Sequence, residues 1–464
     1  MLNYIKGLYG SFFKLPEHIA PLAVLRMAFG SIMLISTARF LSKGWVSAFY
    51  IKPLFHFTFY GFDWVKPLGG TGMYLLFGVL LITSVLVTIG LFYRISIFVF
   101  FLCFTYVELI DKTIYLNHYY FISVMAFLMI LIPAHRYFSI DVLIKPKLAI
   151  TYVPGWMVNI FKLQLVLVYF YAGISKLNYD WLIAAMPLRI WLPASSQLPV
   201  IGGLLTKVWV AYIFSWTGAV FDLLIGFLLL NVRTRKPAYL MVIVFHLVTG
   251  WFFKIGMFPY IMILMTLIFF SENTQLKIIA ALRRIFSIAK SHSLVKEISG
   301  INEPKQFYHL SVVQRKLTGT ILILHFTVQL LLPFRFLLYP GKLYWTEEGY
   351  RFSWRVMLME KGGTAFFHVK DPLTGKESEV VNSQYLTSFQ ENMMATQPDM
   401  ILQYAHFLAG EYQKKGIKDP VVTAESYVTL NGSGSKLYVD RTVNLAKEQE
   451  TFGHKKWIIP FNNK

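Results

Sequence analysis

Residues 163–181 read LQLVLVYFYAGISKLNYDW, an almost wholly apolar run that ends at a lysine and then turns polar. A run of this length and character is typical of a helix that spans a bilayer. Lys176 is then either an interfacial anchor whose ammonium reaches the headgroups, or a base held where the membrane excludes water. The rest of the chain has to separate these two alternatives.

The composition is that of a polytopic membrane protein. Of 464 residues, 56% are hydrophobic and 17% aromatic, and only 15% are charged. The formal net charge of +20 fits loops that face anionic lipid, so we expect no nucleic-acid partner. The single cysteine, Cys103, excludes an intrachain disulfide and is expected to be a small core residue.

Apolar stretches predict about nine transmembrane helices, two of them short. They lie at residues 20–38, 71–91, 95–110, 119–133, 157–175, 208–231, 238–252, 255–270 and 318–334. With the N-terminus in the cytoplasm, four successive basic loops fall on the cytoplasmic side, as the positive-inside rule requires. We expect an integral, multi-pass protein of the bacterial inner membrane or an equivalent bilayer.

One loop resists this topology. Residues 39–70 should lie outside, yet they hold Arg39, Lys43, Lys52 and Lys66. Their aromatic density, as in FHFTFYGFDW, predicts a segment that lies along the membrane surface rather than a free loop.

Toward the C-terminus the composition changes to that of a soluble domain, which divides the chain into a transmembrane part, 1–335, and an α+β domain, 336–464. In the second part, 364–381 is predicted to be a hairpin around a Pro/Gly turn, 397–416 an amphipathic helix and 425–440 a second hairpin. An odd number of spans places this domain outside the cytoplasm. The predicted fold class is therefore a polytopic α-helical membrane protein with a small extracytoplasmic α+β domain.

Polar residues at the outer helix ends gather, by this topology, on one side of the membrane. They are Asp63, Asp111, Lys112, Asn117, His118, Lys176, Asp180 and the segment 253–259. Ionisable groups in a membrane tend to face an internal cavity, so we expect a binding pocket between the helices. Structural alternatives stay open: Lys112 can pair with Asp111 at the interface, and His118 can be a satisfied core histidine.

Two further polar residues lie deeper in predicted spans. Asp222 in TGAVFDLLIG is expected to pair with another group, and His246 lies in VFHLVTG. For both, structural and functional roles remain equally open. The sequence has no HExxH, GxGxxG or Walker motif, and we expect no metal site.

Lys176 becomes a reagent if its side chain faces inward. Burial disfavours the charged form of an amine, and a neutral amine accepts a proton. A quinol dissolved in the bilayer carries a weakly acidic hydroxyl, which such an amine can deprotonate out of reach of bulk water.

Several long stretches resemble the vitamin K-dependent gamma-glutamyl carboxylases and their bacterial, HTTM-domain relatives. They run in order along nearly the whole chain, as FYGFDWVKP (59–67), GLFYR (90–94), ELIDKTIYLNHYYF (108–121), QLVLVYFYAGISKLNYDWL (164–182), TGAVFDLLIGFLL (217–229), FHLVTGWFFKIGMFPY (245–260), YRFSWRVMLM (350–359) and QPDMILQYA (397–405).

The resemblance implies a reaction and a base. In that family a membrane-embedded lysine followed by Leu-x-x-Asp-Trp deprotonates vitamin K hydroquinone, and KLNYDW at 176–181 fits this pattern. Oxidation of the quinol by O2 then drives removal of a γ-proton from a peptide glutamate and addition of CO2, while the quinone leaves as its epoxide. By this resemblance Lys176 is the base, and His118, together with Asn117, contacts the quinol and assists the later steps.

The same resemblance places Asp111 and Lys112 in the quinol-binding wall, and Asp180, Trp181 and His246 are further candidates for it. The implied reactants are vitamin K hydroquinone or a menaquinol-like reduced quinone, O2 and CO2, with no metal. The implied partners are the lipid bilayer and a Glu-containing protein or peptide.

Four residues just beyond the ninth span are candidates for docking that peptide, namely Trp345, Tyr350, Trp354 and Arg355. Aromatic and basic side chains suit an acidic, extended ligand, although an aromatic patch is as often core or interface packing.

The sequence departs from the animal enzymes beside the lysine. Ser175 stands where they have a second lysine, and Asn178 replaces an aspartate, so the local field around Lys176 differs. The single cysteine also excludes the disulfide that ties the two parts of the animal enzymes together. Taken together, these departures make quinol oxidation a safer expectation than protein carboxylation. A quinol epoxidase without carboxylation stays open, as does a non-catalytic lipid- or quinone-binding membrane protein, which would not need a base.

Overall fold

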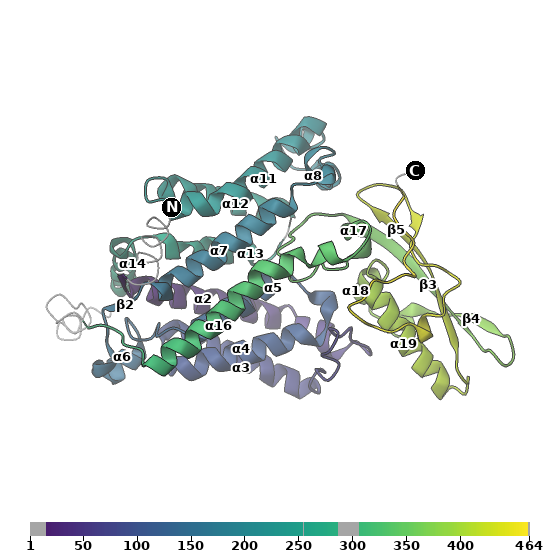
Figure 1. Ribbon diagram of the computed structural model, residues 1–464, viewed down its shortest axis with the longest axis horizontal. Helices are drawn as coiled ribbons and strands as arrows, with labels where there is room; N and C mark the ends of the chain where they lie inside the picture. Colours follow the sequence, from purple (N-terminus) through teal and green to yellow (C-terminus); the bar gives the residue numbers. More distant parts are fainter. Residues whose placement is uncertain (1–14, 254, 286–305, 463–464) are drawn as a thin grey trace.

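A computed structural model describes residues 15–253, 255–285 and 306–462. Within these ranges seven helices are long and apolar enough to cross a membrane. They are α2 (Ala20–Ser42), α3 (Gly70–Ile89), α4 (Tyr93–Ile110), α7 (Trp156–Ser175), α11 (Val208–Leu230), α12 (Arg235–Phe253) and α16 (Val312–Leu331), which continues as a tighter helix, η8 (Leu332–Leu338). These helices occupy one end of the molecule and the sheet domain occupies the other (Figure 1).

Two of the nine predicted spans are shorter as helices. The span expected at 119–133 is α5 (Asn117–Ile130), and the one expected at 255–270 is α13 (Phe258–Met265) with a short extension to Phe269. Both are apolar, but neither has the length of a full crossing, so the multi-pass architecture is confirmed and the count of nine is not. Part of the basic 272–317 loop, residues 286–305 with Lys290, lies outside the described residues.

Helices α7 and α11 approach each other closely because small residues line their contact. A Cβ added at Gly173 would lie 2.7 Å from the backbone nitrogen of Leu223, and one added at Gly226 would lie 3.2 Å from the Cα of Val166. Small residues at a crossing let two membrane helices come together in this way. The contact therefore positions side chains near the end of α7 against the middle of α11.

The C-terminal domain is a four-stranded antiparallel sheet with two helices. The strand order is β4 (Glu377–Glu379), β3 (Lys361–Lys370), β5 (Val421–Leu430) and β6 (Lys436–Leu437), and the helices are α18 (Ser388–Met394) and α19 (Pro398–Lys414). Alternate residues of β5 are buried, as expected for a strand with one face on a core. Both predicted hairpins and the predicted amphipathic helix are confirmed.

The remaining strands and α-helices are short, except for α14, which has 14 residues. They are β1 (Pro16–His18), α6 (Ile140–Ile144), β2 (Tyr152–Pro154), α8 (Tyr179–Leu182), α9 (Leu188–Trp191), α10 (Gly202–Leu205), α14 (Glu272–Ile285) and α17 (Leu343–Thr346). Strands β1 and β2 pair antiparallel.

The aromatic segment between α2 and α3 supports the C-terminal domain. The side-chain amides of Gln390 and Gln403 donate to the carbonyls of Phe55 (2.7 Å) and Thr58 (2.9 Å). Phe57 is fully buried in the core of that domain, whereas Trp64 is 71% exposed. The segment that was predicted to lie along the membrane surface therefore packs against the C-terminal domain through residues 55–58.

Candidate functional site

The close contact of α7 and α11 brings a lysine and an aspartate together. Lys176 directly follows the last residue of α7, and Asp222 lies in the middle of α11. The Nζ of Lys176 is 2.6 Å from Oδ2 of Asp222 and donates to the carbonyl of Ala172 at 3.2 Å. Both side chains are buried, with 6% of each residue exposed. Asp222 therefore has the pairing partner that was expected from its sequence position, and Lys176 is buried between the helices.

Apolar side chains surround this pair. The Nζ of Lys176 lies 5.3 Å from the ring centroid of Trp181, whose indole nitrogen donates to the carbonyl of Ser215 at 2.9 Å. A cavity of about 100 Å³ opens beside them. Its wall is mainly aromatic and aliphatic, and includes Val168, Tyr169, Leu188, Trp191, Phe214, Phe245, Phe253, Phe258, Met262, Val356 and Met357. Such a wall excludes water from the lysine and suits a flat, apolar ligand.

His246 lines the same cavity from α12. Its Nε2 lies 2.9 Å from the hydroxyl of Tyr169, and its Nδ1 is buried without a hydrogen-bond partner among the described residues. The ring of Phe258 stands 5.5 Å from that of His246 and 5.8 Å from that of His118. Phe258 thus lies between the two histidines, and His118 does not line the cavity as it stands.

The cavity continues into a groove on the lipid-facing side of the bundle. This groove, of about 750 Å³, runs between α11 and α12. It shares Phe214, Gly218, Phe245 and Thr249 with the lysine cavity. Val220 and Leu224, which line it, are 47% and 51% exposed, so the groove opens toward the bilayer.

Four residues predicted for the quinol wall instead contact the C-terminal domain. The carboxylate of Asp111 accepts a hydrogen bond from the side-chain amide of Gln390 at 3.1 Å, and that of Asp180 lies 2.8 Å from the Nζ of Lys342. Asp111 also caps the short helix that follows it, through Thr113. Burial raises the pKa of the Asp111 carboxyl to about 6, against the hydrogen bonds that lower it.

The other two of these residues also meet the second part of the chain. Lys112 lies 2.9 Å from Asp399 and 3.6 Å from Glu450. The amide of Asn117 donates to the carbonyl of Arg355 at 2.8 Å. Of the residues proposed from the sequence, the structure therefore groups Lys176, Trp181 and His246 in one cavity and separates the other five from it.

The proposed peptide-docking residues are largely interior. Trp345 and Trp354 are each 1% exposed, and the indole of Trp354 donates to Gln329 of α16 at 3.2 Å. Tyr350 is half-buried. Arg355 is 7% exposed, lies over the ring of Phe336 at 4.2 Å, and has an Nε without a hydrogen-bond partner among the described residues.

A strained segment connects the two parts of the protein at this point. Glu347, Phe352, Trp354 and Met357 all have left-handed backbone angles, with φ between 53° and 61°. Non-glycine residues in this region carry strain that the surrounding structure must hold, and such strain is common at functional sites. The segment ends at Val356 and Met357, which form part of the lysine cavity.

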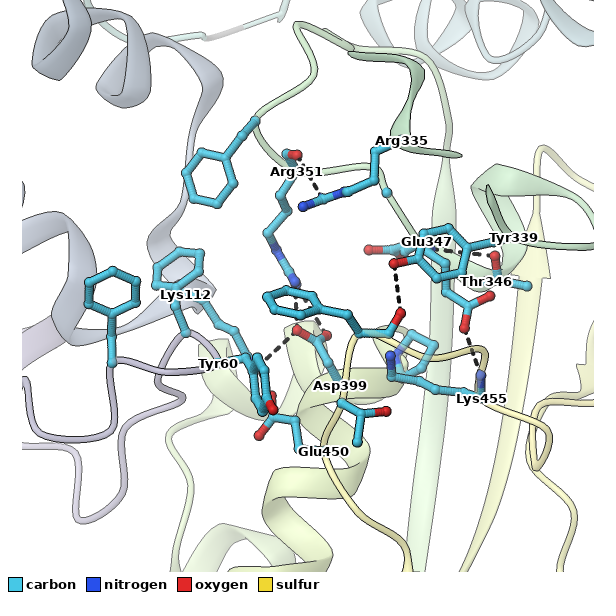
Figure 2. Close-up of a pocket in the computed structure, with 18 of the residues that line it drawn as sticks. Tyr60, Lys112, Arg335, Tyr339, Thr346, Glu347, Arg351, Asp399, Glu450 and Lys455 are labelled. Carbon is cyan, nitrogen blue, oxygen red and sulfur yellow. Dashed lines mark hydrogen bonds and ion pairs between the residues drawn. The ribbon is translucent and has the colours of Figure 1, made fainter. Parts of the chain in front are cut away.

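A second, polar pocket of about 270 Å³ lies where the C-terminal domain meets the helix ends. Figure 2 shows Lys112 and Arg351 converging on Asp399, with Glu450 beside them. The distance from Arg351 Nη1 to Asp399 Oδ2 is 2.6 Å. Burial by itself would raise the pKa of the Asp399 carboxyl, but Arg351 and Lys112 together hold that pKa well below its usual range.

Apart from Lys112, which was assigned to the quinol wall, sequence reasoning gave no role to the charged residues of this polar pocket. Arg351 and Asp399 lie in two of the stretches that resemble the family, at 350–359 and 397–405. The sequence did not show that these two residues would form an ion pair. Among the described residues, no group of three or more His, Cys, Asp or Glu side chains could hold a metal ion.

Family comparisons agree with this two-part architecture. Residues 14–273 match the HTTM domain, which is more than half of the chain. Residues 314–464 match the lumenal domain of vitamin K-dependent gamma-carboxylase. The chain belongs to the vitamin K-dependent gamma-carboxylase family. The family's two domains indicate a carboxylase-like membrane enzyme of the gamma-glutamyl type, and no solved structure matches the chain.

Proposed function

We propose that this gamma-carboxylase relative uses O2 to convert a membrane-dissolved quinol, such as vitamin K hydroquinone, to its epoxide, and couples that oxidation to carboxylation of a protein glutamate by CO2. The observation that carries the proposal is the isolated Lys176–Asp222 pair, 2.6 Å apart, in an apolar cavity that continues into a lipid-facing groove. In this proposal the aromatic head of the quinol lies at the lysine cavity, and its isoprenoid tail lies in the groove between α11 and α12.

The Lys176–Asp222 pair can accept one proton as a unit. An ammonium beside a carboxylate carries three protons on nitrogen and none on oxygen. When Lys176 takes the quinol proton, it passes one of its own to Asp222, so the pair ends as an ammonium beside a carboxylic acid. Lys176 is then the group that touches the quinol, and Asp222 is where the extra proton resides.

The other residues around the cavity have positioning roles in this proposal. Trp181 covers the lysine and keeps water from it. The Nε2 of His246 contacts Tyr169, and its Nδ1, which has no partner in the part of the chain that the structure describes, would hydrogen-bond the second oxygen of the ligand. His118 would assist the later steps after Phe258 moves aside, because that ring now separates it from His246.

Arg355 is the best-supported place for the acceptor glutamate. Its Nε has no hydrogen-bond partner in the described ranges, and the residue lies two positions before the cavity-lining Met357. Tyr344, in electrostatic contact with Arg355, donates to the carbonyl of Ser175, directly before the lysine. A guanidinium recognises a carboxylate through paired hydrogen bonds, which suits the γ-carboxylate of a peptide glutamate. Trp345, Tyr350 and Trp354 then serve as support for this segment, and the C-terminal domain lies on the extracytoplasmic side.

The test is to incubate purified protein with reduced vitamin K, O2 and labelled CO2, with a Glu-containing peptide, and to measure epoxide and incorporated label. Lys176→Ala should lower epoxide formation by about a thousandfold, because general-base catalysis contributes on this scale. Small added amines should partly restore it, since only a proton relay is missing. Lys207→Ala, an exposed lysine at the start of α11, is the control and should keep full activity. Wild-type turnover by Lys176→Ala would refute the role of the lysine.

The two alternatives predict different results in the same assay. An epoxidase forms epoxide without label in the peptide, and a quinone-binding protein forms neither product. Arg355→Gln separates the two halves of the full reaction, because it should reduce label incorporation by about tenfold while epoxide formation persists.

A further inference from the structure

A second lipid-facing groove lies on the opposite side of the bundle from the α11–α12 contact. It has a volume of about 680 Å³ and is formed by α4, α5 and α16. Leu324 and Val328 of α16, which line it, are 65% and 43% exposed. Nothing in the proposed quinol reaction uses this groove.

The dimensions of the groove fit one leaflet. On α4 it extends from Phe101 to Leu109, and on α16 from Ile321 to Gln329. At 1.5 Å per residue, eight steps along a helix cover about 12 Å. Half of a hydrocarbon core is about 15 Å. The groove therefore reaches from near the middle of the membrane to the helix ends next to the C-terminal domain.

The groove is continuous with the polar pocket of Figure 2. Four residues, Phe59, Phe62, Leu109 and Phe352, line both. The end of the groove far from the pocket is lined by Phe101, Phe127, Ile321 and Leu324, and polar side chains line it from its middle, at Thr105, Ser123 and His325, to the pocket end, at Glu108, Tyr120 and Gln329. This order, from apolar to polar and then charged, is that of a membrane lipid from its chain to its headgroup.

Two of the basic side chains that line the polar pocket make no ion pair with a described carboxylate. Each of its four carboxylates has partners: Asp399 and Glu450 contact Lys112, Glu347 contacts Lys361, and Glu348 contacts His454. In the described part of the chain, the side chains of Arg335 and Lys455 make no ion pair with a carboxylate, although both line the pocket.

Arg335 is the better placed of these two cations. Its Nη2 donates to the carbonyl of Arg351 at 3.2 Å, while its Nε is buried with no partner in the described residues. Its backbone is held by Gly349, where an added Cβ would lie 2.7 Å from the Cα of Phe336. The guanidinium is thus held at the pocket by its bond to Arg351. Lys455 lines the same pocket, and guanidinium and ammonium groups are the side chains that bind phosphate in proteins.

We propose that one glycerophospholipid of the leaflet next to the C-terminal domain binds here, with an acyl chain in the α4–α5–α16 groove and its phosphate against Arg335 and Lys455. The bound lipid connects the membrane helices to the C-terminal domain, beside the direct contacts of Lys112 and Asp111. This site is separate from the proposed quinol site and does not depend on the proposed reaction.

Native mass spectrometry of the full chain, released from detergent and titrated with phosphatidylglycerol, tests the proposal. The wild-type protein should retain one tightly bound phospholipid. Arg335→Gln should weaken this binding about tenfold through loss of charge-assisted hydrogen bonds. Leu324→Trp should weaken it similarly by filling the groove. Because Arg335→Gln also loses a contact to Arg351, gel filtration and thermal unfolding must first show that it is folded, and Leu324→Trp provides an independent variant.

Two matched controls should retain the lipid: Arg233→Gln, an exposed arginine between α11 and α12, and Val220→Trp, in the other groove. Diacylglycerol, which lacks the phosphate, should bind at least tenfold more weakly than phosphatidylglycerol. Equal retention by Arg335→Gln and wild type, or equal binding of diacylglycerol, would overturn the proposal. If added inorganic phosphate does not displace the bound phospholipid, the result supports a lipid as the occupant. If inorganic phosphate itself binds, and binds equally well to Leu324→Trp, the pocket is a site for a free anion and the lipid proposal is wrong.

Discussion

Two acid–base clusters of this protein differ in how their charges are partnered. In the lysine cavity Asp222 has one cation, Lys176, and apolar walls around it. In the polar pocket Asp399 has two cations, Lys112 and Arg351. A carboxylate held by two cations stays ionised and fastens the parts that carry them, whereas a single pair in an apolar wall retains the capacity to take a proton. The difference separates a structural cluster from a candidate chemical one.

Removing the carboxylate of the polar pocket should give the largest change in stability. Asp399→Asn leaves Arg351 without a carboxylate and Lys112 with only Glu450 at 3.6 Å. We expect about 3 kcal/mol of destabilisation, because an unpaired buried charge is costly. Thermal unfolding in detergent measures it, with Asp419→Asn, the same change at an exposed position, as control. Equal unfolding temperatures for the two variants would show that the cluster does not hold the domain.

The pH dependence of stability should have two arms with opposite signs. Asp399 has a lowered pKa, so its stabilisation is present above the ordinary carboxyl value near 4 and is lost as the pH falls below it. Asp111 has a pKa raised to about 6, so its contribution is greatest below pH 4 and is lost as the pH rises through 6. Unfolding temperatures recorded from pH 3 to 7 measure both arms. Asp399→Asn should flatten the lower arm, and Asp111→Asn should flatten the upper one. The assignment fails if either variant leaves its arm unchanged.

Filling the quinol groove should give a smaller and more selective change. Val220→Trp places a large ring between α11 and α12, where the tail would lie. We expect the KM for a long-tailed quinol to rise about tenfold, while that for a short-tailed quinol stays nearly constant. Leu324→Trp, in the phospholipid groove, is the matched control. The same KM increase for both tail lengths would contradict the tail assignment.

Sequence patterns predicted the parts of this fold that depend on local chemistry. Hydropathy located the membrane helices, and turn residues with alternating burial located both hairpins of the C-terminal domain. The span at 255–270 was predicted longer than α13, because apolar residues continue beyond the last α-helical turn into the tighter segment that follows, and the span at 119–133 was placed two to three residues too far along the chain. Apolar composition marks membrane depth and does not mark where a helix ends.

The candidate site was less predictable, because tertiary packing decides which of the polar residues line the lysine cavity and which contact the C-terminal domain. Topology placed Asp111, Lys112 and Lys176 at one side of the membrane. It could not show that the C-terminal domain would cover the first two, since Gln390 and Asp399 lie some 280 residues further along the chain. The Lys176–Asp222 pairing also depends on the α7–α11 crossing at Gly173, which periodicity alone does not reveal.

A double-mutant cycle on Lys176 and Asp222 tests the central claim that these residues accept the quinol proton as one unit. The measurement is the rate of epoxide formation by wild type, Lys176→Ala, Asp222→Asn and the double variant, each shown to be folded. If the pair acts as a unit, each single variant should lose about a thousandfold, and the double variant should be no slower than either. Losses that multiply to about a millionfold, or full activity in Asp222→Asn, would contradict the account.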